Sequence, residues 1–238
     1  ISQQHVQQIV KDNKTVYGVN TGFGILANTP ISEEDTATLQ YKILQSHSVG
    51  VGDPIPVEVA KIMMITKVHA LAQGFSGVQL STMERIIWHI ENEVIPVVPE
   101  KGSVGASGDL APLAHLFLPL IGLGKVFATD EHRVTQINSI EVLKQKGLEP
   151  IQLGPKEGLA LINGTQFILA FAVKAVQRMR NCLDAADIIG AMSLEALTGT
   201  KAPFDERLHE LRPFKGSKLV AQRLRLLLHD SDIMQSHI

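Results

Sequence analysis

The sequence has little of what several classes of protein depend on. It contains one cysteine, Cys182, in 238 residues, so no disulfide scaffold can form within the chain and a reducing cytoplasm is expected. The formal net charge is only -2, which excludes the broad basic field that binds nucleic acid. The longest apolar runs are too short, or too broken by polar residues, for an ordinary membrane span. We therefore expect a small-molecule ligand, with neither nucleic acid nor a membrane as partner, and Cys182 in the core.

Motifs for nucleotides and metals are missing as well. The glycines of residues 18–24 do not have the G-x-G-x-x-G spacing, and no predicted strand precedes them. Gly124-Lys125 match the last two residues of the phosphate-loop motif G-x-x-x-x-G-K, but the first glycine of that motif would fall at Pro119. The histidines and the cysteine form neither H-x-x-x-H nor C-x-x-C patterns. We expect no nucleotide and no metal cofactor.

Helical periodicity dominates what is present. Apolar residues make up 45% of the chain, enough to bury a sizeable core. The predicted helices cover residues 1–14, 32–47, 56–73, 80–94, 109–123, 165–197 and 217–229. Ser32 and a Ser81-x-x-Glu84 box are their clearest start signals. The one strand signal is a hairpin formed by residues 125–127 and 133–135. The predicted fold class is mainly α: a helical bundle with a small β-hairpin and an active-site loop between helices.

The longest helix sets the expected domain organisation. At about 1.5 Å per residue it would be a rod of roughly 50 Å, which a small domain cannot cover, so other segments or subunits must share its bundle. We expect residues 1–150 to form an N-terminal active-site domain and residues 151–238 to start a central long-helix bundle. The sequence begins with Ile1 and ends at Ile238 without a terminating signal, so we expect truncation at both ends.

A glycine-rich junction leads into the apolar helix that starts near residue 109. Gly108 has no Cβ, so its amide nitrogen can approach the carbonyl carbon of Ala106 and close a five-membered ring. Loss of one water from that ring, and of the Ser107 hydroxyl as a second, would leave an electrophilic methylidene carbon. On its own, Ala-Ser-Gly is more often a helix-entry turn, and Asp109 a cap in the first turn of the helix.

The longer run from Val98 to His115 resembles the signature of the histidine/phenylalanine ammonia-lyase family. The resemblance implies that Ala106, Ser107 and Gly108 mature autocatalytically into the prosthetic group 4-methylidene-imidazol-5-one, abbreviated MIO. It also implies that Asp109 assists ring closure. Residues 15–24 and 155–165 match the family too, and the similarity extends from about residue 15 to residue 199.

The resemblance also supplies the expected substrate-binding residues. His47 would recognise an imidazole ring, because Ser46-His47 stands where histidine-specific members carry Ser-His, phenylalanine enzymes Phe-Leu and tyrosine enzymes His-Leu. Tyr17 would act as an acid or base near the β-carbon. Asn163 would orient the substrate carboxylate or the prosthetic carbonyl. From the residues alone, each of these could equally be an ordinary packed, capping or exposed side chain.

The activity that the resemblance implies is elimination of ammonia from L-histidine to give trans-urocanate, a step of histidine degradation that needs no metal. Either the substrate amine or its imidazole ring could attack the methylidene carbon. The expected partners are L-histidine and further copies of the chain, as a homotetramer with shared active sites. Family members bring a further tyrosine and an arginine from beyond residue 238. Two alternatives stay open: a phenylalanine or tyrosine ammonia-lyase or aminomutase, and a non-catalytic helical assembly module.

Overall fold

The computed structural model describes residues 1–23, 29, 31–104, 108–130 and 133–236. Two compact units are formed, Ile1–Ala172 and Val173–Ile238. The division lies further along the chain than the expected domain boundary at residue 150. The physical reason is that α7 (Glu157–Ile162) packs against α2 (Glu33–His47) and α5 (Leu110–Phe117), so it belongs with the first unit. The expected residues Ala106 and Ser107 lie outside the described part of the chain.

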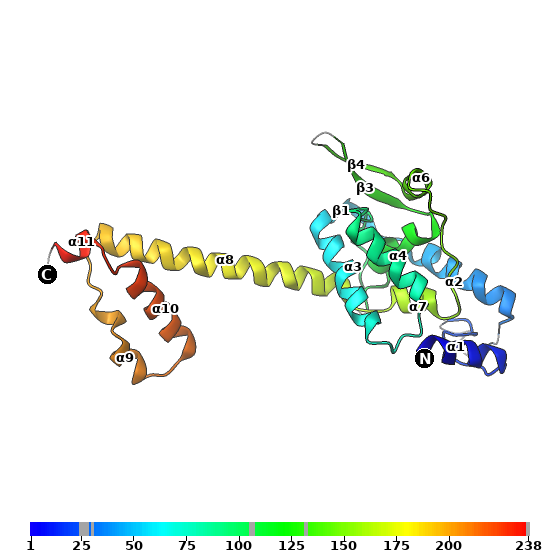
Figure 1. Ribbon diagram of the computed structural model, residues 1–238, viewed down its shortest axis with the longest axis horizontal. Coiled ribbons are helices and arrows are strands. Elements are labelled where there is room, and N and C mark those ends of the chain that lie inside the picture. Colours follow the sequence, from blue (N-terminus) through cyan, green and yellow to red (C-terminus); the bar gives the residue numbers. More distant parts are fainter. Residues whose placement is uncertain (24–28, 30, 105–107, 131–132, 237–238) are drawn as a thin grey trace. The chain divides into compact units, whose positions relative to one another are not determined.

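Helices dominate the first unit, as predicted (Figure 1). Besides α2, α5 and α7 it contains α1 (Ser2–Lys11), α3 (Val57–Ala72), α4 (Leu80–Glu91), α6 (Ser139–Gln145) and the start of α8 (Gln166–Ala196). A 3-10 turn, Leu118–Ile121, continues α5 and contains Pro119. The predicted helix over residues 109–123 is therefore shorter and changes type, because proline lacks the amide hydrogen that an α-helix needs.

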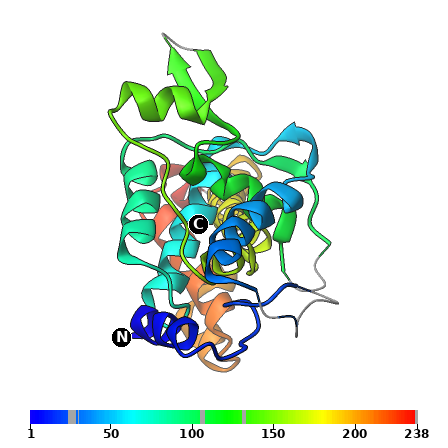
Figure 2. The ribbon, with the colours of Figure 1, turned by 90° about the vertical axis from the view of Figure 1, so that its right-hand side faces the viewer.

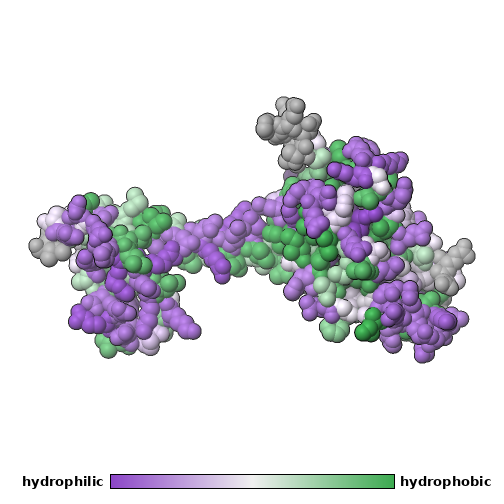
Figure 3. Space-filling view, in the orientation of Figure 1, coloured by the Kyte–Doolittle hydropathy of each residue, from purple (hydrophilic) through white to green (hydrophobic). Residues whose placement is uncertain are grey.

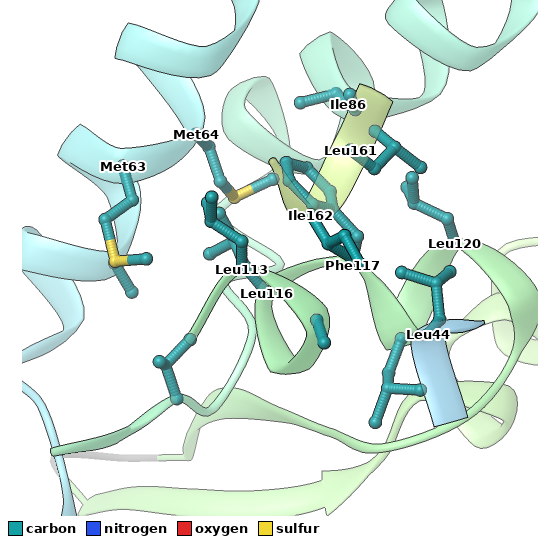
Figure 4. Close-up of a cluster of buried hydrophobic side chains, with 14 of the residues drawn as sticks. Leu44, Met63, Met64, Ile86, Leu113, Leu116, Phe117, Leu120, Leu161 and Ile162 are labelled. Carbon is teal, nitrogen blue, oxygen red and sulfur yellow. The ribbon is translucent and has the colours of Figure 1, made fainter. Parts of the chain in front are cut away.

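The core of the first unit lies where α2, α3, α4, α5 and α7 meet (Figure 4). Its largest fully buried side chains are Leu44, Met63, Met64, Ile86, Ile95, Leu113, Leu116, Phe117, Leu120, Leu161 and Ile162. Each buried aliphatic or aromatic side chain of this size contributes about 1.5–3 kcal/mol relative to an exposed one. The helix that follows the glycine-rich junction, α5, is thus anchored in the centre of this unit.

Of the two helix-start signals in the sequence, one is confirmed and one is not. Ser32 does cap α2, because its Oγ accepts from the amide of Asp35 at 3.1 Å. The Ser81-x-x-Glu84 box was wrong, since the cap position of α4 is Gln79, two residues before Ser81. The buried carboxylate of Glu157 instead accepts from the backbone amide of Gln79 at 2.7 Å and from its side-chain amide at 2.8 Å. The residue before α4 is thus held in place by a carboxylate that is 78 residues away in the sequence.

Two small antiparallel sheets are present among the described residues. The predicted hairpin is confirmed and longer than expected, pairing β3 (Lys125–Asp130) with β4 (Arg133–Asn138), and it lies beside α6 at one edge of the unit (Figures 1 and 2). The second sheet pairs β1 (Val51–Pro54) with β2 (Pro99–Lys101). It escaped prediction because β1 is short, exposed throughout and contains glycine and proline. The strands of this second sheet adjoin two segments that line the candidate site, since β1 follows Val49 and β2 precedes Gly102.

The second unit contains the rest of α8, then α9 (Glu206–Glu210), α10 (Lys215–Leu227), α11 (Asp232–Gln235) and a 3-10 turn, Ala202–Phe204. Its small core consists of Ala191, Leu224, Leu228 and Met234. Arg223 bridges Asp184 and Asp187 of α8 at 2.6 and 3.1 Å, so it holds α10 to α8.

Helix α8 confirms the predicted long rod, and much of its apolar surface is uncovered (Figure 3). The exposed apolar residues on it are Ile168, Leu169, Phe171, Val173, Val176, Met179, Leu183, Ile188, Ile189 and Met192. By length and composition alone, the stretch Glu157–Ala196 could cross a membrane. Cys182 is exposed on this helix, so its expected place in the core was wrong. The apolar pattern around it faces outward within this chain.

Candidate active site

The C-terminal end of α2 and the start of α5 line one pocket together with the glycine-rich junction. Its volume is about 230 Å³. The described lining consists of Ser46, His47, Val49, Gly102, Val104, Gly108, Leu110 and Ala111. Two groups of predicted site residues, the Ser46-His47 pair and the end of the Ala-Ser-Gly triplet, are therefore neighbours in space although some 60 positions apart.

His47 has a hydrogen bond at one ring nitrogen, and within the described residues the other ring nitrogen has none. Its Nδ1 lies 2.9 Å from the carbonyl oxygen of Ile43, one turn earlier in α2. A carbonyl oxygen only accepts, so Nδ1 carries the proton and, in the neutral ring, Nε2 is an acceptor. The hydroxyl of Ser46 lies 3.1 Å from the same Nδ1. This half-buried imidazole can therefore accept one hydrogen bond from a ligand donor.

His115, on α5, is bonded to the backbone next to the lining residue Val49. Its Nε2 accepts from the backbone amide of Gly50 at 3.0 Å, which requires the neutral ring. Burial lowers the pKa of His115 below its usual value and favours that neutral form. Gly50 in turn lies against Gly102, where an added Cβ would come within 3.1 Å of the Gly50 Cα. No role was predicted for His115, because its partner is 65 residues away in the sequence.

Gly108 occupies a position that accepts only glycine. Its φ is +113°, in the region that side chains disfavour, and an added Cβ would lie 2.4 Å from the carbonyl oxygen of Gly164. The next amide, that of Asp109, donates to the same carbonyl at 2.7 Å. The two strongest motifs of the sequence, residues 98–115 and 155–165, therefore meet backbone to backbone at Gly108 and Gly164.

The side chain of Asp109 is fully buried and links the junction to α8. One carboxylate oxygen accepts from the Ser103 hydroxyl at 2.6 Å, and the other accepts from the amide of Ile168 at 3.2 Å. Ile168 lies in the first turn of α8, whose free amides attract negative charge. The expectation that Asp109 caps its own helix was wrong, because it makes no side-chain cap to α5 and caps α8 instead.

Asn163 lies at the end of α7 with its side chain exposed. The backbone carbonyl oxygen of Asn163 accepts a hydrogen bond from Nζ of Lys67, on α3, at 2.8 Å. Lys67 is almost completely buried, and this desolvation lowers its pKa to about 7. Sequence reasoning missed Lys67, although a lysine in a predicted helix that is apolar nearly all round, residues 56–73, was the signal for it.

Tyr17 is not brought to the pocket. It lies on the loop after α1, is 54% exposed and meets Phe23 edge to face, with ring centroids 6.1 Å apart. Neither Tyr17 nor Asn163 belongs to the described lining of the pocket. Within the described ranges, no three His, Cys, Asp or Glu side chains are grouped so that they could hold a metal ion.

Comparison with known proteins identifies the class. The sequence profile of the family described as aromatic amino acid lyase matches residues 1–238, and the chain belongs to this family. Among its relatives, the histidine ammonia-lyase of Vibrio cholerae serotype O1 is 45% identical over 237 residues, which cover 99% of this chain and 46% of that protein. The chain thus spans about half the length of the curated relatives it matches.

Solved structures give the same class. The histidine ammonia-lyase of Trypanosoma cruzi is 42% identical with a TM-score of 0.86, and the match covers 99% of this chain and 45% of that one. The tyrosine aminomutase of Streptomyces globisporus is 33% identical with a TM-score of 0.88, covering 98% and 43%. The mainly helical fold predicted from the sequence is therefore confirmed by related structures as well as by the elements themselves.

Proposed function

We propose that this chain is the prosthetic-group-forming part of a histidine ammonia-lyase, which eliminates ammonia from L-histidine to give trans-urocanate. One observation carries the proposal: Ser46 and His47 line the same pocket as Gly108. The similarity to histidine ammonia-lyases at about 45% identity supports the same substrate.

The described residues fit the MIO group. The carbonyl oxygen of Gly164 fills the space of a side chain at residue 108, so the third position of the triplet must be glycine. Ring closure balances without an oxidant. The Gly108 nitrogen bonds to the Ala106 carbonyl carbon, whose oxygen leaves as water with the Gly108 and Ser107 amide protons. The Ser107 hydroxyl leaves as a second water with its Cα proton. When formed, the group supplies an electrophilic carbon that accepts electrons while ammonia departs.

The chain's own side chains select and orient the substrate. Nε2 of His47 accepts the N–H of a substrate imidazole, while the bond from Nδ1 to Ile43 keeps the ring in the correct tautomer. By family resemblance, Asn163 orients the substrate carboxylate or the prosthetic carbonyl, and Tyr17 transfers a proton near the β-carbon. Asp109 assists ring closure from its fixed position between Ser103 and α8.

Assembly is part of the proposal. The exposed apolar residues of α8 would be covered by other helices of a homotetramer that shares its active sites. Lipid is a poor alternative, because Arg178 and Arg180 are exposed near the middle of this helix and charges are costly inside a bilayer. A cytoplasmic location completes the proposal, since the free thiol of Cys182 is exposed and a reducing compartment preserves it.

A substrate comparison tests the proposal. The whole protein that carries this sequence is assayed with histidine, phenylalanine and tyrosine side by side, and urocanate formation from histidine should dominate. The structural similarity to tyrosine aminomutase favours one second candidate, a tyrosine-directed lyase or aminomutase. Preference for tyrosine would select that candidate, and turnover of none of the three would favour a non-catalytic assembly module.

A further inference from the structure

Lys67 is a buried amine that no step of the proposed reaction uses. It is 2% exposed on α3, between the buried Met63 and Met64 on one side and Leu71 on the other. Among the described residues, no ion pair includes Lys67, and its one described hydrogen bond is to the Asn163 carbonyl. Burying an amine without a carboxylate is costly, and the lowered pKa of about 7 reflects this cost. A purely structural position would be filled more cheaply by an apolar side chain.

The bond from Lys67 leads directly to the glycine-rich junction. Lys67 Nζ donates to the carbonyl of Asn163 at 2.8 Å, and the neighbouring carbonyl, that of Gly164, accepts from the Asp109 amide at 2.7 Å. The Gly164 carbonyl is also the group against which Gly108 is packed. Three contacts therefore connect a buried amine on α3 to the peptide unit that follows the ring-closing nitrogen.

We propose that Lys67 is a positioning residue for formation of the prosthetic group. It fixes the Asn163-Gly164 turn, and this turn fixes the peptide that joins Gly108 to Asp109. Held in this way, the Gly108 nitrogen has less freedom to lose when it bonds to the Ala106 carbonyl carbon. Lys67 itself exchanges no proton or electron in that step. The inference rests on the proposed function, because it concerns how the same group forms.

Intact-mass measurement of the whole protein tests this role. Lys67→Met has a side chain of similar length without a donor, and Lys67→Arg restores a cationic donor. Lys61→Met is the matched control, because Lys61 lies on the same helix and pairs with exposed Glu93 at the surface. Each variant is followed from synthesis for the loss of two waters, and its thermal unfolding midpoint is recorded.

We expect Lys67→Met to lose the two waters at least about tenfold more slowly than wild type, with little change in Tm. Lys61→Met should mature like wild type, and Lys67→Arg should recover most of the rate. Equal maturation of Lys67→Met and wild type would overturn the positioning role and leave the proposed function intact. A wild-type protein whose mass shows no loss of two waters would overturn the proposed function itself.

A second variant covers the case in which Lys67→Met does not fold. Lys67→Gln is one atom shorter, so its amide is out of reach of the Asn163 carbonyl, and its slow maturation would support the proposal. Normal maturation of folded Lys67→Gln would overturn it. A lower Tm together with slow maturation that Lys67→Arg fails to restore would show a purely structural role, which also overturns it.

Discussion

Replacing Asp109 by alanine should destabilise the first unit by about 1.5–3 kcal/mol. The change removes the side-chain cap on α8, worth about 0.5–2 kcal/mol, and the bond from Ser103, worth about 1 kcal/mol. Asp109→Asn is the matched variant. Its carbonyl can still accept from the Ile168 amide and its amide can donate to the Ser103 hydroxyl, so only the charge–dipole attraction of about 0.3–1 kcal/mol is lost.

Urea unfolding of the whole protein measures this difference, with the slope m checked for constancy so that the midpoint reports stability. Hydrogen exchange at the Ile168 amide provides a local readout, and it should accelerate in the alanine variant far more than in the asparagine variant. The reasoning is refuted if Asp109→Ala costs less than about 0.5 kcal/mol, the usual effect of a surface substitution. It is equally refuted if the asparagine and alanine variants are destabilised to the same extent.

Three further predictions concern selectivity, ring geometry and pH. Replacing Ser46-His47 by Phe-Leu should lower kcat/KM for histidine relative to phenylalanine by roughly 10²-fold, because the ring acceptor is lost; an unchanged ratio would remove His47 from recognition. Gly108→Ala should block the loss of two waters and cost more stability than Gly147→Ala, which also has positive φ but open space around it; equal costs would mean that the close carbonyl contact is unimportant. Burial lowers the pKa of His89 to about 4, so its contribution to stability, at most about 3 kcal/mol, is complete above pH 6.5 and lost as pH falls to 4. A His89→Leu variant whose stability fell as steeply over this range, measured by urea unfolding, would contradict that assignment.

Local pattern was sufficient for the longer helices and for the hairpin, but not for the short helices α6 and α7, which were not predicted. Apolar spacing and the Ser32 cap are properties of short segments, so α2, α3, α8 and the β3–β4 pair followed from the sequence. The β1–β2 pair did not, because its strands are short and 45 or more residues apart. Cys182 was misplaced for a related reason: an apolar helical face predicts burial, but not whether this chain supplies the cover.

The candidate site, too, was predictable only in part: several of its residues were predicted, but the contacts that hold them were not. The motifs placed Gly108, Asp109 and His47 in one region, and the pocket brings Gly108 and His47 together. The contacts that hold the site were not predictable, since Lys67 and Asn163 are 96 residues apart and His115 and Gly50 are 65 apart. The bond from the Ile168 amide to the Asp109 carboxylate was also missed. A capping pattern predicts a bond to the helix that follows in the sequence, whereas Asp109 caps the more distant helix α8.

The central claim is that residues 106–108 form the MIO group, and the most direct measurement is the mass of the peptide that contains them. This peptide, isolated from the whole protein after proteolysis, should be lighter than its sequence by two waters. The same peptide from a Ser107→Ala variant, which has no hydroxyl to eliminate, cannot lose the second water and should come from an inactive protein. A wild-type peptide with the full mass of its sequence, from a protein that still converts histidine to urocanate, would contradict the account.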